Sequence, residues 1–178
     1  MSHDYRIFIG AFPGGALADQ IQAMREQYDP KTARITAPHV TLAGTYWRSG
    51  PATAVNEAHL IAGFKALKCI RPLTLTLGGI YTFGQGVIYL GVAISPTLLA
   101  ARQTLVNLVG PDKHGEHFTP HLTLAMRLKG RAFTQTVSEL KGSTWDNSHF
   151  SAPIDRLHLM QRGPADPAWR TIATLPLA

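Results

Sequence analysis

Two almost identical hexapeptides are the part of the sequence whose residue types and spacing point most directly to chemistry. They read PHVTLA and PHLTLA, and each carries a histidine followed two residues later by a threonine: His39 and Thr41, then His121 and Thr123. Imidazole can give or take a proton near neutral pH, and a threonine hydroxyl can donate a hydrogen bond to an oxygen on which charge develops. The paired motifs therefore predict acid–base chemistry on a phosphate ester, with these four catalytic residues and no metal.

Each motif has the alternation of a β-strand, in which successive side chains point to opposite faces. His39 and Thr41 would share one face, while Val40 and Leu42 would take the other. The second copy has the same pattern. The apolar residues can anchor each strand in a core while imidazole and hydroxyl face a cleft.

The elements around the motifs follow the same order in both halves of the chain. Tyr5 begins an apolar strand and Val87 begins another, and 34 residues separate each of them from the histidine that follows. Each half reads strand, helix, motif strand, helix, strand. We therefore expect an α+β fold of two similar lobes, each an antiparallel sheet with helices on its outer face. A pseudo-two-fold axis would relate the lobes, with the catalytic cleft between them and the two motifs facing each other, and residues 1–178 would form one two-lobed domain.

Hydrophobic periodicity and turn residues give the approximate bounds of the elements. We expect helices after Pro13, over 53–68, after Ser95 and around Phe133–Leu140. We expect the remaining strands over 35–47, 73–83, 121–128, 157–160 and 171–177, with a bulge or bend at the glycine pair 78–79.

Composition describes a globular protein rather than a disordered one, with 45% hydrophobic and 16% charged residues among 178. The net charge of +6 favours anionic partners such as nucleotides or nucleic acid, although the basic residues are scattered. No apolar run approaches the roughly 20 residues that a membrane span requires, so no membrane association is expected. The single cysteine, Cys69, rules out an internal disulfide. It indicates a cytoplasmic protein, and we expect the thiol to be buried.

The sequence resembles the two-histidine phosphoesterase superfamily, and most of all the bacterial RNA 2',3'-cyclic phosphodiesterases, also called 2'-5' RNA ligases. The resemblance lies in RIFIGAFP, LTLTLGGIYTFGQGVIYLGV and FTPHLTLA, as well as in the paired motifs. It implies hydrolysis of RNA or nucleotide 2',3'-cyclic phosphate ends to 2'-phosphates, without a cofactor, as part of RNA processing. It also implies weak 2'-5' RNA ligation in some members, and a monomer is expected.

Two further residues are candidates for substrate binding, although both depart from the family pattern. The family has an aromatic residue shortly after the first motif, and here Gly44 and Thr45 come before Tyr46 and Trp47. It has an arginine shortly after the second motif, and here Met126 comes before Arg127. We expect Tyr46 to stack on a base and Arg127, which shares strand parity with His121, to reach the phosphate.

Several alternatives remain open at the level of the sequence. The same site could act on another ribose cyclic phosphate, such as an ADP-ribose derivative, or the protein could be a nucleotide- or RNA-binding module without turnover. The spacing of His114, His117 and His121 could also suggest zinc, but His121 already belongs to the repeat. We expect His39 to protonate the leaving 3'-oxygen and His121 to activate water, an assignment that the near-symmetry of the motifs leaves reversible.

Overall fold

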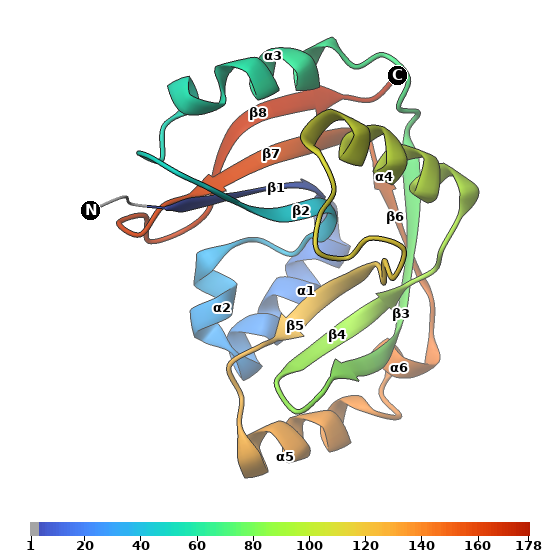
Figure 1. The fold of residues 1–178 in the computed structure, drawn as a ribbon. Helices are drawn as coiled ribbons and strands as arrows, with labels where there is room; N and C mark the ends of the chain where they lie inside the picture. The colour runs from blue at the N-terminus through green and yellow to red at the C-terminus, as the bar shows by residue number, and fades with distance from the viewer. Residues whose placement is uncertain (1–3) are drawn as a thin grey trace.

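The computed structural model describes residues 4–178 and shows one curled, eight-stranded antiparallel sheet with helices packed against it (Figure 1). The strands are β1 (Tyr5–Ala11), β2 (Val40–Arg48), β3 (Leu73–Phe83), β4 (Val87–Val92), β5 (His121–Ala125), β6 (Phe150–Ile154), β7 (Arg156–Arg162) and β8 (Arg170–Pro176). The helices are α1 (Gly15–Tyr28), α2 (Pro30–Ile35), α3 (Ala58–Ala66), α4 (Pro96–Val109), α5 (Gly130–Leu140) and α6 (Thr144–Asn147), with a 3-10 turn at Ala54–Glu57.

The sheet consists of two half-sheets that meet at the motif strands. The strand order is β6-β3-β4-β5-β2-β1-β7-β8, so β5 ends one half and β2 begins the other. The two halves are joined through a single residue pair, Val40 opposite Leu122. The expected α+β fold with two similar halves is confirmed. The halves form one continuous sheet, so the motif strands lie side by side and do not face each other across a gap.

Helices α1 and α4 each pack against the motif strand of the opposite half-sheet. Helix α1 follows β1 but lies against β5, whereas α4 follows β4 but lies against β2 (Figure 1). The apolar positions of the motifs supply the buried surface for this packing, because Val40, Leu42 and Leu122 are fully buried. The other face of both motif strands is left for a site, as the alternation predicts.

Three short elements were not expected from the sequence: α2, α6 and β6. The first motif strand was expected from residue 35, but α2 occupies 30–35 and β2 begins at Val40. The second motif strand ends at Ala125, short of the expected 128. Cys69 is exposed, so the expectation of a buried thiol is wrong; it lies in the connection between α3 and β3. Across residues 4–178, none of the helices has the length and apolarity needed to cross a membrane.

Candidate active site

A cleft of ≈ 370 Å³ opens over the junction between β2 and β5. Its lining includes all four side chains that the motifs single out: His39, Thr41, His121 and Thr123. The apolar partners point into the core and the polar residues point into the cleft. The two motifs, 82 positions apart in the sequence, thus contribute to one concave surface.

The register between β2 and β5 sets how the four side chains lie relative to one another. Because Val40 lies opposite Leu122, continuing the antiparallel register by one residue on each side places His39 opposite Thr123 and Thr41 opposite His121. The two histidines are then diagonal neighbours, a relation that separates Cα atoms by roughly 7–8 Å. A group the size of a phosphate can lie between two imidazoles arranged in this way.

Each imidazole is oriented by a backbone carbonyl two residues earlier in the chain. Nδ1 of His39 lies 2.9 Å from the Ala37 oxygen, and Nδ1 of His121 lies 2.8 Å from the Thr119 oxygen. A carbonyl oxygen only accepts hydrogen bonds, so Nδ1 carries the proton in both rings. Nε2 of each histidine is left to exchange a proton with a bound molecule.

Aromatic rings hold both imidazoles from the side. The ring of His39 stacks on Phe8 and Phe12, with centroid distances of 4.8 and 5.2 Å. The ring of His121 makes edge contacts with Phe83 and Tyr89, at 4.9 and 5.2 Å. These contacts restrict rotation of the rings and shield one side of each from solvent.

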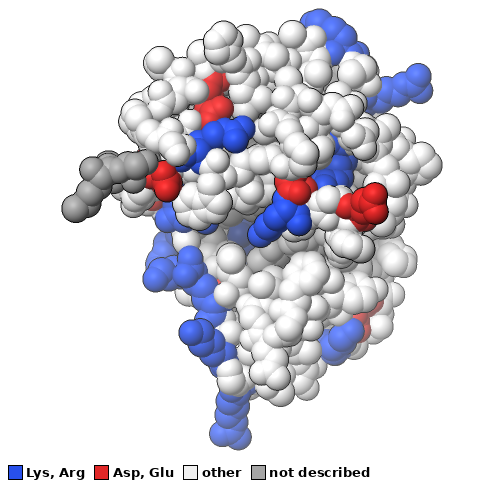
Figure 2. Space-filling model, viewed as in Figure 1, with Lys and Arg blue, Asp and Glu red and all other residues white. Residues whose placement is uncertain are grey.

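The cleft is strongly cationic. None of the lining residues that the structure describes is Asp or Glu. Five of them carry a positive charge: Arg6, Arg25, Lys113, Arg127 and Arg162. Figure 2 shows basic side chains from the top of this face to its lower tip, several of them near its middle, while most of the acidic side chains lie in its upper half. A cleft with this charge attracts anions such as phosphate esters.

Arg25, on α1, is the least exposed of these cations, at 1%. Its Nη1 donates hydrogen bonds to the Thr36 carbonyl and to Oε1 of Gln22, each at 2.9 Å. Its Nε has no hydrogen-bond partner within residues 4–178. Burial lowers the pKa of Arg25 to about 10, so the guanidinium remains charged at neutral pH. A positive charge is therefore fixed beneath the cleft.

The two histidines differ in how strongly their surroundings oppose a positive charge. Burial is the largest effect on His39 and lowers its pKa to about 4; the bond to Ala37 opposes this shift, whereas the charges of Arg25 and His121 add to it. Burial also lowers the pKa of His121, opposed by the bond to Thr119 and assisted by Lys113. At neutral pH both imidazoles are therefore predominantly neutral.

Two aspartates tie the motif strands to the helices packed against them. Asp29, which follows α1, accepts hydrogen bonds from the backbone N–H groups of Met126 and Arg127 at 2.9 and 3.0 Å. Asp112, which follows α4, accepts a hydrogen bond from the Gly44 N–H at 3.0 Å. Gly44 and Met126 each lie five positions after a motif histidine, so the two halves repeat this support as well.

Asp112 also forms a buried ion pair with Arg102 of α4. Nη1 and Nη2 of Arg102 donate to the two carboxylate oxygens at 2.8 and 2.9 Å, and Nη1 also donates to the Leu42 carbonyl at 2.8 Å. Burial raises the pKa of Asp112, but the bonds from Arg102, Gly44 and His114 outweigh it and hold that pKa well below its usual range. This ionic cluster joins α4, β2 and the loop that leads to His121.

Comparison with known proteins identifies the family. The family model described as the 2'-5' RNA ligase superfamily matches residues 13–166. The chain belongs to the 2'-5' RNA ligase superfamily. A phosphoesterase of Bacillus licheniformis is 31% identical over 151 residues, which cover 84% of this chain and 85% of that protein. A phosphoesterase of Staphylococcus haemolyticus is 26% identical over 97% of this chain and 99% of its own length.

Solved structures show the same fold. E. coli LigT in its apo form aligns over 98% of both chains with a TM-score of 0.62 and 18% identity. A protein of Thermus thermophilus aligns over 97% of both chains with a TM-score of 0.63 and 16% identity. Membership in the 2'-5' RNA ligase superfamily supports phosphoesterase activity for this chain in general terms.

The two residues proposed to bind substrate, in addition to the four motif residues, have different outcomes. Arg127 lies in the cleft lining, just beyond the end of β5. The structure corrects the expectation for Tyr46, which is 8% exposed and donates a hydrogen bond from its hydroxyl to the Gly110 carbonyl at 2.8 Å. Tyr46 lies opposite Ile7 of β1, which is fully buried, so its ring belongs to the core and cannot stack on a base in the cleft.

Several residues that line the cleft were not predicted from the sequence. Arg25, Arg6, Phe8, Arg162 and Trp169 line the cleft from elements far from either motif. For Arg25 a signal existed, since it lies next to Met24 on the helical face that also carries Ile21 and Tyr28. Of the histidines considered for zinc, His114 lies in the cleft lining and His117 is exposed. Within residues 4–178, no group of three His, Cys, Asp or Glu side chains is arranged to hold a metal.

Proposed function

We propose that this protein hydrolyses the 2',3'-cyclic phosphate of RNA ends or nucleotides to a 2'-phosphate by two-histidine acid–base catalysis that needs no metal. The observation that carries the proposal is the diagonal pair of imidazoles in one cationic cleft, each with a free Nε2 and each across from a threonine. Such a pair supplies both proton transfers that opening a cyclic phosphate requires.

In the proposed reaction, one histidine takes a proton from water as the water oxygen forms a bond to phosphorus. The bond between phosphorus and the 3'-oxygen breaks, and the other histidine gives its proton to that oxygen. The product keeps its phosphate on the 2'-oxygen. Thr41 and Thr123 donate hydrogen bonds to the non-bridging oxygens, and Arg127 and Lys113 offset their negative charge.

The surroundings of the histidines favour His39 as the base and His121 as the acid, the reverse of the roles expected from the sequence. Arg25 lies close enough to His39 to disfavour its charged form, and burial acts in the same direction. His121 is not subject to the Arg25 charge to the same degree, and a bound phosphate anion would favour its protonation. Neutral His39 can then accept the proton of water while protonated His121 donates one.

Solved relatives support a nucleotide as the ligand. E. coli LigT has been crystallised in complexes with phosphate, ATP, NADP+ and 3'-AMP. The three nucleotides among these ligands share a ribose with phosphate, which is the chemistry that a cationic cleft with two imidazoles would recognise. A cyclic phosphate of an ADP-ribose derivative has the same reacting group, so it belongs in the substrate panel, and a module that binds nucleotides without turnover would release no product from any of them.

The test is hydrolysis of the four nucleoside 2',3'-cyclic monophosphates, a cyclic-phosphate-ended oligonucleotide and an ADP-ribose cyclic phosphate, with EDTA present. We expect formation of 2'-phosphates, and we expect His39→Ala and His121→Ala each to lower kcat by about 10²- to 10⁴-fold, the usual contribution of a general acid or base. His59→Ala, an exposed histidine on α3, is the matched control and should behave as wild type.

Two results would contradict the proposal. The first is a folded His39 or His121 variant that keeps more than about a tenth of the wild-type rate, because a proton-transfer residue contributes at least about 10²-fold. The second is activity that EDTA abolishes and that zinc or manganese restores. Circular dichroism of each variant establishes that the fold is intact.

A further inference from the structure

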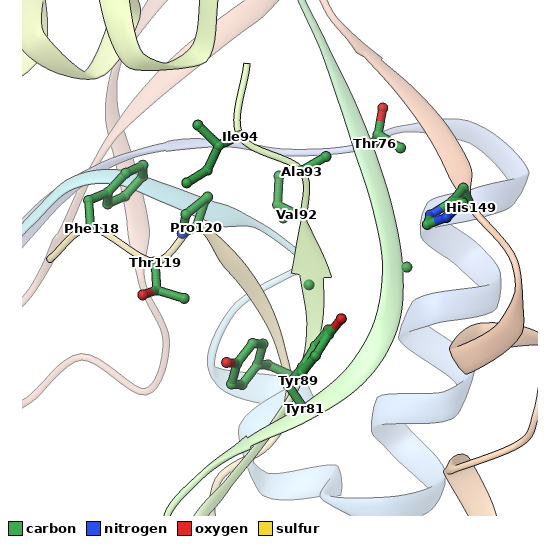
Figure 3. A pocket seen from close by; sticks show the side chains of 12 residues that line it. Thr76, Tyr81, Tyr89, Val92, Ala93, Ile94, Phe118, Thr119, Pro120 and His149 are labelled. Carbon is green, nitrogen blue, oxygen red and sulfur yellow. The ribbon is translucent and has the colours of Figure 1, made fainter. Parts of the chain in front are cut away.

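A second pocket, of ≈ 340 Å³, lies next to the catalytic cleft in the half-sheet that carries His121. We call it the tyrosine pocket, and it is formed mainly by Tyr81, Tyr89, Ile94, Phe118, Pro120 and His149. Figure 3 shows the two tyrosine rings side by side at one end, Phe118 and Pro120 along one side and His149 on the opposite side. Its volume is at the lower end of the roughly 300–1,000 Å³ typical of small-molecule sites.

Glycines make room for the Tyr81 ring, which forms one wall of the tyrosine pocket. A Cβ at Gly91 would lie 2.7 Å from the Tyr81 ring, and a Cβ at Gly79 would lie 2.6 Å from it. The ring of Tyr81 therefore rests on bare backbone of two strands, at Gly79 in the bulge of β3 and at Gly91 of β4. Any side chain at either glycine would have to displace the ring.

The aromatic surface of this pocket is accessible. Tyr81 is 52% exposed and Ile94 is 59% exposed, although both are large apolar side chains. Tyr81 stacks on Tyr89 with a centroid distance of 5.8 Å and an interplanar angle of 27°. Exposed rings of this kind are the surfaces on which nucleobases stack.

The tyrosine pocket is continuous with the catalytic cleft. Tyr89 lines the pocket and also contacts the His121 ring. Thr119, whose carbonyl orients His121, and Pro120, which precedes it, line the pocket as well. A chain bound with its phosphate at His121 therefore has the pocket immediately beside it.

The two cavities differ in charge in the way that the two parts of a nucleotide do. The cleft is lined by arginines and a lysine, whereas none of the lining residues described for the tyrosine pocket is Lys, Arg, Asp or Glu. The phosphate and its ribose suit the cleft, and an uncharged planar ring suits the pocket. Lys141, whose Nζ lies 5.5 Å from the Tyr81 ring centroid, is already paired with Asp146 at 3.7 Å, so the pocket itself stays without a free charge.

We infer that the tyrosine pocket binds the base of the nucleotide on the 5' side of the cyclic-phosphate nucleotide, so that the preferred substrate is an RNA end and not a mononucleotide. The terminal nucleotide fills the cleft between the histidines, and the neighbouring base stacks on Tyr81. This inference rests on the proposed cyclic phosphodiesterase function and adds the substrate class to it.

Three substrates separate the inference from the function on which it rests. They are cytidine 2',3'-cyclic phosphate, a dinucleotide that ends in the same cyclic phosphate, and that dinucleotide with an abasic 5' nucleotide. We expect the wild-type protein to have a KM for the intact dinucleotide about tenfold below that for the other two, in line with the contribution of one stacked base.

Variants of the tyrosine pocket should affect only the intact dinucleotide. Tyr81→Ala is expected to raise its KM about tenfold, a loss within the range of base stacking, while the mononucleotide kinetics stay unchanged. Tyr81→Phe keeps the ring and should retain the wild-type preference. Ile94→Ala should lower the preference partly, and Val55→Ala, at an exposed apolar residue outside the pocket, is its matched control.

Each possible result has a defined meaning. Hydrolysis of mononucleotide and dinucleotide with equal KM by the wild-type protein would overturn the inference and leave the proposed function standing. Equal impairment of both substrates in Tyr81→Ala would also overturn it, because the ring would then act on His121 through Tyr89. Hydrolysis of none of the substrates would overturn the proposed function and the inference together.

Discussion

The guanidinium of Arg25 makes the two otherwise similar histidines different. His39 and His121 share the same backbone contact through Nδ1, and each is flanked by two aromatic rings. Arg25 is buried on α1, and its positive charge contributes to the low pKa of His39. One buried cation can therefore decide which imidazole acts as the base.

The pH dependence of kcat/KM tests this asymmetry. The proposed mechanism requires neutral His39, so we expect activity to rise with pH through a pKa of about 4. It also requires protonated His121, so we expect activity to fall through a pKa below the usual value. We expect a bell with its maximum on the acid side of the unperturbed histidine pKa of about 6.5. The two flanks describe the coupled pair.

Replacing Arg25 by methionine removes a positive charge near His39 and so stabilises its imidazolium form. The pKa of His39 rises, and the ascending limb of the bell moves to higher pH while the descending limb stays in place. Arg25→Lys keeps the charge and should keep the wild-type profile, and Arg34→Met, at an exposed arginine of α2, is the matched control. An unshifted ascending limb in folded Arg25→Met would show that this charge does not tune His39.

At the scale of elements, the notable feature is that helices and motif strands are exchanged between the halves. Helix α1 packs on β5 and α4 packs on β2, and Asp29 and Asp112 fix the ends of these contacts by accepting backbone hydrogen bonds. Neither half-sheet can place its own motif without the helix of the other. Geometry at the cleft is therefore coupled to the packing of the whole core.

The ion pair of Arg102 and Asp112 should be the most sensitive point of this arrangement. Their side chains are 8% and 0% exposed, so Asp112→Asn leaves a buried guanidinium without its counter-charge. Breaking a buried pair in this way costs about 3–5 kcal/mol, to be measured as the free energy of unfolding in urea. Asp155→Asn breaks an exposed pair with Arg156 and should remain close to wild type.

The Arg102–Asp112 pair also predicts how the stability of the fold changes as the pH falls. The pKa of Asp112 is lower in the folded state than in the unfolded state, so its stabilisation is present above the unfolded value of about 3.9 and is lost as pH falls below it. Asp112→Asn should therefore be less stable at neutral pH and show a shallower loss of stability below about pH 4. Equal slopes for the two proteins would assign the acid transition to other carboxylates.

Long, periodic elements could be predicted from the sequence, and short ones could not. Both motif strands and the helices α1 and α4 follow from alternation and from apolar spacing. Strand β6 was missed because it has only five residues and one of them is Pro153, which suits only a strand at the edge of the sheet. Helix α2 has only six residues, although Asp29 and Pro30 form a recognisable start.

The residues of the candidate site also fall into those that could be predicted from the sequence and those that could not. The motifs predict four polar side chains on one surface, because a strand fixes the parity of its residues. They cannot predict Arg25 or the tyrosine pocket, which depend on how α1 and the β3–β4 hairpin pack in three dimensions. Tyr46 shows the limit: its distance from the motif is close to that expected, but two register shifts of β2 against β1 place it opposite the buried Ile7 and so in the core.

At the scale of the whole molecule, charge is distributed unevenly. The net charge is +6, and basic side chains continue from the cleft over the face shown in Figure 2. The sequence indicated a modest preference for anions because the basic residues are scattered along the chain. Folding places several of them around one cavity, so the electrostatic potential there is more positive than the net charge alone would suggest.

This positive potential predicts that activity on an RNA end depends on salt. Between about 50 and 200 mM salt, we expect kcat/KM for a cyclic-phosphate-ended oligonucleotide to fall more steeply than for a mononucleotide, because more phosphates release counterions. Lys113→Gln should reduce the slope, whereas Lys65→Gln on α3 should not. Parallel slopes for the two substrates would indicate that only the terminal phosphate is held.

The pairing of Val40 with Leu122 also bears on which molecule attacks phosphorus. Because the register sets each histidine opposite the other motif's threonine, the entering and the departing oxygen meet equivalent imidazole–threonine pairs. By microscopic reversibility, such a pair serves the forward and the backward step with the two roles exchanged. In the proposed mechanism, the base next to Arg25 takes a proton from whichever hydroxyl lies beside the phosphate, that of water or that of a second RNA strand. Whether the cyclic phosphate is hydrolysed or two RNA strands are ligated then depends on which hydroxyl reaches the cleft, and not on a different set of catalytic residues.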